Sequence, residues 1–294
     1  MDEQEWLAER FEEHRSHLRA VAYRMLGSLS EADDAVQDAY LRLSRADTSD
    51  VENLGGWLTT VVARVSLNML RSRQSRREEP IGVYVPEPII DSLAGTDPEH
   101  EALLADSVGL ALLVVLETLT PAERLAFVLH DMFGVPFEQI APVVERSPQA
   151  TRQLASRARR RVQGEQTVPD ADLGRQREVV DAFFAAAREG DFDALVAVLD
   201  PDVVVRANFG AVPSAAGREV RGAVQVASQA LLYSRLGLEA RPALINGVAG
   251  AVSTRNGKAF SVGAFTIRGG RIVAIDILAD PARVGQLDLT VLDD

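Results

Sequence analysis

The sequence contains no cysteine, which excludes disulfides, thiolate metal sites and cysteine nucleophiles. It has no run of the roughly 18 apolar residues that are needed to span a bilayer. Its N-terminus is acidic and amphipathic, without the basic region and apolar core of a secretory signal. These absences together predict a cytoplasmic protein.

Histidine is also scarce, and its four residues are scattered over the first half of the chain at His14, His17, His100 and His130. Only His14 and His17 have a spacing, i and i+3, that suits chelation on a helix. Their acidic surroundings favour a solvated face instead. We therefore expect no metal and no cofactor.

The charge is distributed unevenly along the 294 residues, a length that predicts two or three domains. The formal net charge is −12, yet basic residues cluster between Arg71 and Arg77 and between Arg152 and Arg161. A globally acidic chain with local basic patches is expected to bind DNA weakly alone, and better beside a larger partner that adds contacts.

The most informative stretch is predicted to be two short helices joined by a tight turn, from Phe137 to Val162. Ser147 is a suitable cap for the second helix, and Pro148 suits its first turn. Such a helix enters the DNA major groove in helix-turn-helix proteins, although an ordinary surface helix with solvated arginines is the alternative. Its predicted apolar stripe is Ala150, Leu154, Ala158 and Val162. The residues predicted to contact DNA are Gln149, Arg152, Gln153, Ser156, Arg157 and Arg160.

Proline, glycine and helix-capping residues predict where the segments of the chain begin and end. Asp97-Pro98 reads as a cap followed by a first-turn proline, and Thr120 with Glu123 as a capping box. The predicted segments are a helical module at 3–77, an irregular linker at 78–97, a helical module at 98–164, a linker at 165–174 and a C-terminal module at 175–294.

The C-terminal module is predicted to begin with helices at 175–189, ending at Gly190, and at 191–199. Four short apolar runs rich in β-branched residues follow, at 203–205, 249–254, 259–267 and 271–278. Gly269-Gly270 suits a hairpin turn between the last two. Helices followed by an antiparallel sheet predict an α+β domain.

Two helices of the first module carry candidate binding faces. The helix from Ser30 to Ser44, with a serine cap, has an acidic face that is either solvated or docks on a basic partner helix; it consists of Asp33, Asp34, Gln37 and Asp38. The helix from Trp57 to Arg73 combines an aromatic ring with arginines, which suits single-stranded DNA, although Trp57 alone suits a core or hinge position as well. Its candidate residues are Trp57, Thr60, Arg64, Asn68, Arg71 and Arg73.

This succession of an acidic helix, a Trp-Leu-led helix ending in arginines, a linker and a terminal helix-turn-helix resembles an extracytoplasmic-function (ECF) sigma factor of bacterial RNA polymerase. The linker sequence Tyr84-Val85-Pro86-Glu87-Pro88 is similar to the Trp-Leu-Pro-Glu-Pro signature of a subgroup with a C-terminal SnoaL-like domain. The resemblance implies a multidomain fold: two all-α sigma domains (a region 2 helical bundle and a region 4 helix-turn-helix), then an α+β, cone-shaped SnoaL-like domain of the nuclear transport factor 2-like (NTF2-like) fold.

The resemblance also implies partners and roles. The partners are core RNA polymerase, through its β′ and β subunits, and promoter DNA. The acidic face would dock on the coiled coil of β′, the Trp57 helix would meet the −10 element, and the helix after Ser147 would read the −35 element. The linker would thread near the active-site and RNA-exit channels, and the C-terminal domain would modulate activity in cis.

Two motifs of the C-terminal domain depart from the subgroup pattern. Ala207-Asn208-Phe209-Gly210-Ala211, before Val212-Pro213, stands where Asp-Gly-Gly-Gly-Lys is usual, so the lysine charge is lost. Near the end, Asp280-Pro281-Ala282-Arg283-Val284 replaces Asn-Pro-Asp-Lys-Leu, and Arg283 keeps a positive charge. Asp280, Pro281 and Arg283 are expected to take part in linker regulation.

Two other functions fit parts of the sequence. A stand-alone repressor would bind an operator as a symmetric dimer and sense a small molecule through its C-terminal domain. An enzyme of the ketosteroid isomerase-like fold would depend on a pocket carboxylate such as Asp276, but residues 164–294 hold no histidine and one tyrosine, Tyr233. Asp276 either lines that pocket or pairs with an arginine such as Arg206 or Arg255. We expect no enzymatic activity.

Overall fold

The computed structural model describes residues 3–46, 51, 53–75, 83–93, 109–164, 169–210 and 218–290. The chain forms two compact units. The helical unit comprises Met1–Glu79, Pro98–Asp106 and Leu116–Gln163, and the C-terminal unit comprises Pro80–Asp97, Ser107–Val115 and Gly164–Asp294. The two helical modules that the sequence separates thus belong to one unit, and the linker belongs to the other. The predicted Asp97-Pro98 cap, Arg76 and Arg77, and Ala211 to Pro213 lie outside the described residues.

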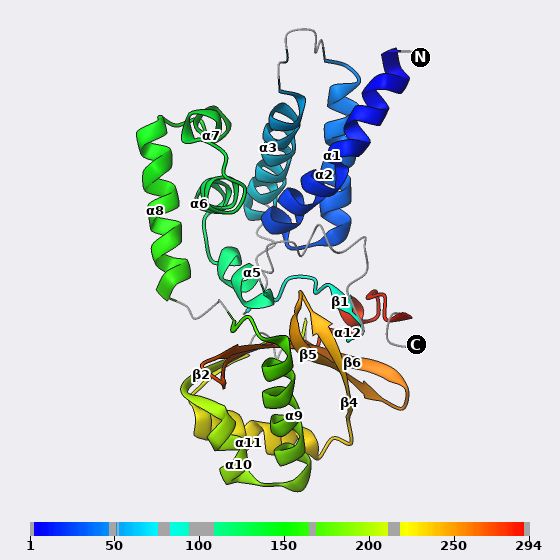
Figure 1. The fold of residues 1–294 in the computed structure, drawn as a ribbon, viewed down its shortest axis with the longest axis vertical. Helices are drawn as coiled ribbons and strands as arrows, with labels where there is room; N and C mark the ends of the chain where they lie inside the picture. Colours follow the sequence, from blue (N-terminus) through cyan, green and yellow to red (C-terminus); the bar gives the residue numbers. More distant parts are fainter. Residues whose placement is uncertain are drawn as a thin grey trace. The chain divides into compact units, whose positions relative to one another are not determined.

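The helical unit begins with a three-helix bundle of α1 (Glu3–Leu26), α2 (Leu29–Leu43) and α3 (Leu54–Ser75), seen in blue in Figure 1. Gly27 ends α1 with a φ of 69°, and Ser28 then caps α2 by accepting a hydrogen bond from the backbone N–H of Glu31. The cap is therefore Ser28 and not Ser30, because the chain already enters the helix at Leu29. The buried face of α2 consists of Ala32, Ala35, Val36, Ala39 and Leu43.

The second half of the helical unit is a series of short helices. They are α5 (Leu110–Glu117, shared with the C-terminal unit), α6 (Pro121–Phe127), a π-helical turn η1 (Val128–Met132), α7 (Phe137–Val144) and α8 (Pro148–Gly164). The predicted Thr120–Glu123 capping box is confirmed. Ser147 accepts a hydrogen bond from the N–H of Ala150 at 3.2 Å, so the predicted cap of α8 is confirmed as well.

The apolar stripe of α8 differs from the prediction. The structure buries Thr151, Ala155 and Ala158, while Ala150 is only half-buried. The Thr151 hydroxyl donates to the carbonyl of Ser147 at 3.0 Å, and this bond within the first turn lets a polar residue face the core. The prediction missed it because it counted only apolar side chains.

The bundle and the helix-turn-helix pack against each other within the helical unit. Arg124 is 2% exposed; its Nε donates to the carbonyl of Arg24 at 3.1 Å, and its Nη1 pairs with Glu117 at 2.6 Å. The ring of Phe133 meets the ring of His17 edge-on, with centroids 5.2 Å apart, and lies under the Arg24 guanidinium. These contacts join α1 of the bundle to α6 and to the residue that follows η1.

The C-terminal unit is built on a seven-stranded mixed sheet with the order β1-β4-β5-β6-β7-β2-β3. β2 and β7 pair in parallel, and the other neighbouring strands of this sheet pair antiparallel. The strands are β1 (Ile90–Asp91), β2 (Leu199–Asn208), β3 (Arg218–Arg221), β4 (Glu239–Ile245), β5 (Val248–Arg255), β6 (Lys258–Arg268) and β7 (Arg271–Leu278). The four predicted apolar runs fall in β2, β5, β6 and β7, and Gly269-Gly270 forms the predicted turn.

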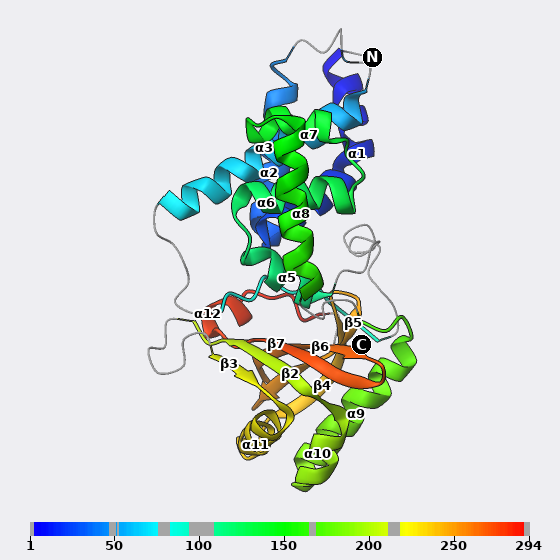
Figure 2. The same ribbon diagram turned by 90° about the vertical axis from the view of Figure 1, so that its left-hand side faces the viewer.

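Helices α9 (Leu173–Glu189), α10 (Phe192–Val198) and α11 (Ala223–Ser234) cover one face of this sheet (Figures 1 and 2). A short helix, α12 (Pro281–Val284), follows β7. Gly190 ends α9 with a φ of 77°, as predicted. The α+β class predicted for this part of the chain is confirmed, and the core between helices and sheet is centred on Phe183, Leu195, Phe265 and Ile275.

Candidate functional site

The second helix of the helix-turn-helix, α8, presents the predicted DNA-contacting face to solvent. The exposed residues are Gln149, Arg152, Gln153, Ser156, Arg157 and Arg160. Within the described residues, Gln149, Gln153 and Arg160 form no side-chain hydrogen bond or ion pair. The face therefore offers amide and guanidinium donors of the kind that bind base edges and phosphates.

Two arginines of this face are held by carboxylates. Arg152 Nη2 lies 2.9 Å from Glu138 Oε1, and its guanidinium lies 5.5 Å from the centroid of the Phe137 ring. Arg157 Nε lies 2.9 Å from Glu123 Oε1. The arginine and glutamate side chains of the first pair are 57% and 62% exposed, so solvent screens it and it contributes little to stability. A phosphate or a base can replace the carboxylate at small cost.

Glu123 connects this face to the start of α6. Burial alone would raise the pKa of Glu123, but hydrogen bonds from Arg157 and from the Thr120 hydroxyl and N–H outweigh it and lower the pKa below its ordinary value. The carboxylate thus stays charged and serves both the capping box and Arg157.

The residues of the candidate face on α3 differ in their exposure to solvent. Arg64, Asn68 and Arg71 are exposed, whereas Trp57 and Thr60 are half-buried. The sixth candidate residue, Arg73, is also half-buried: it forms an ion pair with Glu31 and donates to the carbonyl of Leu26 at 3.2 Å. Arg73 therefore joins α3 to the turn between α1 and α2.

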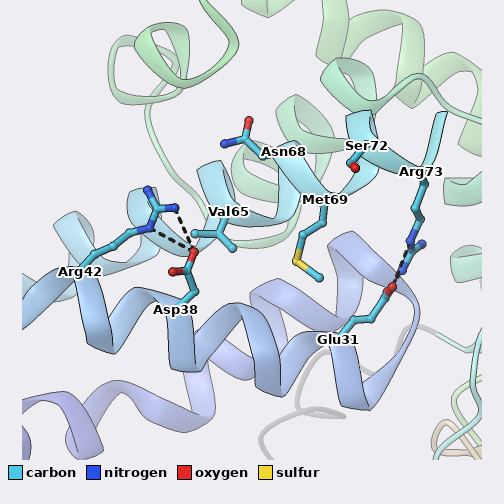
Figure 3. A pocket seen from close by; sticks show the side chains of 8 residues that line it. All are labelled: Glu31, Asp38, Arg42, Val65, Asn68, Met69, Ser72 and Arg73. Carbon is cyan, nitrogen blue, oxygen red and sulfur yellow. Dashed lines mark hydrogen bonds and ion pairs between the residues drawn. The ribbon is translucent and has the colours of Figure 1, made fainter. Parts of the chain in front are cut away.

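A groove of about 330 Å³ runs between α2 and α3 (Figure 3). Asp38 and Arg42, which pair at 3.0 Å, lie at one part of it, and the Arg73–Glu31 pair lies at another. Asn68 projects from α3 at its rim. The groove thus adjoins both the acidic candidate face of α2 and the candidate DNA face of α3.

On the acidic face itself, Asp33, Asp34 and Gln37 are exposed and Asp38 is half-buried. Asp33 pairs with Arg19 at 2.7 Å, whereas Asp34 makes no ion pair with any residue the structure describes. Leu41 lies one turn beyond Gln37 and is 45% exposed. Sequence reasoning missed it, although its position at i+7 from Asp34 places it on the same face.

The linker residues 83–93 are bound along the edge and one face of the C-terminal sheet. Arg283 Nη1 donates to the Val85 carbonyl at 2.7 Å, and the Arg283 guanidinium lies 4.7 Å from the Tyr84 ring centroid. Asn208 Nδ2 donates to the Val83 carbonyl at 3.0 Å. Val85, Pro86 and Pro88 are buried, and Glu87 is half-buried. We call this arrangement the linker site.

Further along, the linker becomes a strand. Ile89 exchanges two hydrogen bonds with Asn246, and Ile90 and Asp91 pair with Ile245 and Leu244 as β1. The prediction of an irregular linker is therefore wrong at these two residues. Ile90 and Asp91 form a strand because the edge of β4 offers free backbone groups to pair with. The prediction missed this because β4 lies far away in the sequence.

The motif that ends the domain supports the linker site. Asp280 caps α12 by accepting a hydrogen bond from the N–H of Ala282 at 3.0 Å, and Pro281 occupies its first turn. This cap fixes the single helical turn that carries Arg283. Gly210 approaches the same cap closely, since a Cβ there would lie 2.6 Å from the Asp280 carboxyl carbon.

The stretch from Ala207 to Gly210 serves both faces of the sheet. Ala207 and Phe209 line a cavity under α9 and α11, while Asn208 points to the opposite face and binds the linker. Asn208, Asn246 and Arg177, which donates to the Leu93 carbonyl at 3.1 Å, are linker-binding residues that the sequence analysis did not assign to this role. Their partners are backbone groups, which leave no pattern in a sequence.

Asp276 does not line the cavity. It alternates with Ile275 and Ile277, which do, and it lies opposite Arg206 in the parallel pair of β2 and β7. Arg206 Nη1 and Asp276 Oδ1 are 3.2 Å apart, and the side chains are 8% and 1% exposed. The alternative in which Asp276 is a pocket carboxylate is thus wrong, and the alternative of pairing with Arg206 is confirmed.

His17 and His130 make structural contacts. His17 Nε2 lies 3.3 Å from the Thr59 hydroxyl, and burial, followed by the charges of His14 and Arg24, lowers the pKa of His17. No cluster of three metal-ligating side chains occurs among the described residues. None of the described helices has the length and apolarity to cross a membrane.

Comparison with known proteins covers nearly the whole chain. Residues 10–76 match the model of Sigma-70 region 2, and residues 109–162 match that of Sigma-70, region 4. The ECF RNA polymerase sigma factor SigJ of Mycobacterium tuberculosis is 39% identical over 92% of this chain and 91% of its own length. The probable ECF RNA polymerase sigma factor SigI of the same species is 35% identical over 93% of each. The crystal structure of M. tuberculosis SigJ superimposes with a TM-score of 0.75, at 35% identity, over 95% of this chain and 98% of that one.

Proposed function

Because this chain belongs to the ECF RNA polymerase sigma factors, which bind core RNA polymerase and promoter DNA, we propose that three of its helices divide these contacts and that its C-terminal domain regulates them through the linker. The predicted surfaces are α2 for polymerase, α3 for the −10 element and α8 for the −35 element. The assignment to a sigma factor leaves no support for a stand-alone repressor.

The role of α8 rests on its exposed donors. Gln149 and Gln153 carry amides that suit adenine edges, and Arg152 suits guanine, each in the major groove. Arg157 and Arg160 lie further along the helix and neutralise phosphates. A capped helix in the second position of a helix-turn-helix presents its first turns to the bases, which is where Gln149, Arg152 and Gln153 stand.

The role of α3 rests on Arg64, Asn68 and Arg71, which share an exposed face with the half-buried Trp57 at its start. Arginines on this face bind the phosphates of the −10 strand, while Asn68 reads a base and Trp57 stacks on one. Arg73 stabilises the position of this helix against α2 through its ion pair with Glu31.

For α2 we propose docking on the coiled coil of the β′ subunit. Asp34 and Gln37 offer polar contacts, and the exposed Leu41 adds an apolar one on the same face. An exposed leucine on the same face as carboxylates fits a basic helix of a partner.

Promoter binding requires the helical unit to open. The −35 and −10 positions lie about 25 base pairs apart, or about 85 Å along B-DNA at about 3.4 Å per base pair. A compact unit of this size is only about 40 Å across. The contacts of Arg124 and Phe133 that join the two modules must therefore break when both elements are bound.

The linker site carries the proposal of regulation in cis. The buried contacts of Val85 and the Arg283 bond to its carbonyl keep the linker on the C-terminal domain, so this linker is not available to the channels of the polymerase. Covalent attachment gives the domain a high effective concentration for the linker. It can therefore shift an equilibrium between held and released linker without a separate regulatory protein.

We infer that this domain acts without catalysis. Asp276, the apolar-strand carboxylate that a ketosteroid isomerase-like mechanism would use, is paired with Arg206 on the face away from the cavity. The carboxylates that line the cavity, Asp181 and Glu239, are exposed. An acid or base with a tuned pKa needs a dry environment, which these two lack.

The decisive experiment is in vitro transcription with core polymerase and the Arg283→Ala variant. Loss of the Val85 bond and of the contact with Tyr84 frees the linker, and we expect transcription to rise at least about tenfold, because a hydrogen bond from a charged group is worth about 1.5 kcal/mol or more. Arg271→Ala, at an exposed arginine of β7, is the matched control. Equal activity of the Arg283→Ala variant and the wild type would contradict regulation through the linker, while leaving the promoter contacts untouched.

A further inference from the structure

The C-terminal unit contains a cavity that the sigma-factor activity does not use. It lies between α9, α11 and the inner face of the sheet, and its volume is about 510 Å³. This is within the range of sites that bind small molecules in proteins, about 300–1,000 Å³. Its walls come from β2, β5, β6 and β7 as well as from the two helices, so it is part of the folded core.

Most of the lining is apolar and aromatic. Phe183, Phe184 and Phe265 meet edge-to-face, with ring centroids 5.5 to 5.6 Å apart. Ile275 and Ile277 line it from β7. An apolar ligand would bury its surface against rings that already hold each other in place, which lowers the entropic cost of binding.

A few polar side chains interrupt this lining at defined positions. Ser253 and Ser261 lie directly opposite each other in the pairing of β5 and β6, and Gln229 faces the cavity from α11. Among the described residues these three side chains have no hydrogen-bond partner. Ser261 is only 5% exposed. Ser253 is half-buried, and both serines line the cavity, so a ligand oxygen that bonds to them gains a contact that no described residue supplies.

The charged lining residues lie elsewhere. Asp181, Arg188 and Glu239 are all exposed, and two of the three are acidic. A ligand anion in the interior would lose its hydration without gaining a buried cation. The interior therefore favours a neutral molecule over an anionic one.

We propose that this cavity binds one neutral small molecule with a largely aromatic or alicyclic skeleton and a hydroxyl or carbonyl oxygen. The skeleton packs against Phe183, Phe184 and Phe265, and the oxygen bonds to Ser253 and Ser261. The proposal concerns binding alone and is independent of the proposed role of the linker site.

The test uses fluorescent probes of one skeleton that differ in polarity: pyrene, 1-hydroxypyrene and 1-pyrenecarboxylate, titrated with the full-length chain. We expect one probe bound per chain, with 1-hydroxypyrene about fivefold tighter than pyrene, since a net hydrogen bond contributes about 1 kcal/mol. The carboxylate should bind more weakly than both. A carboxylate that binds most tightly would overturn the proposed ligand class.

Two variants locate the probe. Ala230→Trp, on the cavity side of α11, fills the space and should abolish binding. The double variant Ser253→Ala and Ser261→Ala keeps the volume and should make pyrene and 1-hydroxypyrene bind equally. Ser228→Ala, on the exposed face of α11, is the control and should change nothing.

Either variant alone can show whether the probe binds in this cavity. If Ala230→Trp does not fold, as judged by circular dichroism, the serine double variant still reports on the site. Absence of probe binding to the folded wild type, or an unchanged preference for 1-hydroxypyrene after both serines are replaced, would overturn the proposal.

Discussion

Arg283 in the linker site and Arg152 on α8 both lie beside an aromatic ring, at 4.7 Å and 5.5 Å from the ring centroid. Arg283 donates to a backbone carbonyl beside a buried valine, whereas Arg152 pairs with an exposed glutamate. The first contact is fixed by the path of the chain, and the second can be exchanged for another anion. Burial and the type of acceptor thus separate arginines that hold the structure from arginines available to a ligand.

The buried pair of Arg206 and Asp276 gives the largest expected effect. Asp276→Ala leaves a buried guanidinium without its carboxylate, and we expect a loss of about 3 kcal/mol in the free energy of unfolding. Glu138→Ala removes the partner of the exposed Arg152 and should cost less than about 0.5 kcal/mol. Urea denaturation of both variants measures the contrast. Similar losses in the two would contradict the distinction drawn from burial.

The double variant Arg152→Ala and Gln153→Ala should affect function and leave stability nearly unchanged. Each contact to a base edge is worth about 1–3 kcal/mol, so transcription from the cognate promoter should fall by about 100-fold. Co-purification with core polymerase should not change, because the polymerase surface is proposed on α2. Wild-type promoter selectivity in this variant would rule out α8 as the reading helix.

Asp34→Arg tests the surface on α2, with a smaller expected effect. Asp34 is exposed and makes no ion pair with the described residues, so reversal of its charge leaves the fold intact. We expect the affinity for core polymerase to fall about tenfold, as for one unfavourable charge contact at an interface. The control is Asp193→Arg on the exposed side of α10. Equal affinities of the two variants would argue against docking through α2.

The smallest effect concerns Glu123. Its contact with Arg157 is intermediate in burial between the Arg206–Asp276 pair and the Arg152–Glu138 pair. Its pKa is lower in the folded state than in the unfolded state. Its charge therefore stabilises the fold above the unfolded pKa, and this stability is lost as the pH falls through the folded value. Glu123→Gln should cost about 0.5 kcal/mol near neutral pH, and the cost should vanish in acid. A difference that is constant with pH would contradict the assigned cause.

Local sequence signals predicted the elements that depend on neighbouring residues. Ser147, Thr120, Gly190 and the pair Gly269-Gly270 act within one turn of the chain, so their caps and turns follow from the sequence. Helical periodicity likewise predicted the residues of α2, α3 and α8 that the structure exposes. Their roles stay predictions, because exposure does not identify a partner.

Contacts between distant residues were harder to predict. Arg73 belongs to a basic run, yet Glu31 and the Leu26 carbonyl engage it through the packing of three helices. The pairing of Ile90 with Ile245 joins residues that share no pattern. Asp276 has one candidate partner in Arg206 and another in Arg255, and only the parallel register of β2 and β7 selects the first.

The pairing of the linker with β4 has a consequence for the solubility of the domain. Only Leu244 and Ile245 of β4 receive the linker strand, and the rest of this edge carries Glu239, Arg241 and Pro242. Charges and a proline on an edge strand discourage other chains from adding to it. If the linker is released as proposed, the newly open stretch of β4 is two residues long, which is too short to start intermolecular sheet growth. Repeated release and rebinding of the segment, as proposed above, would thus not promote aggregation.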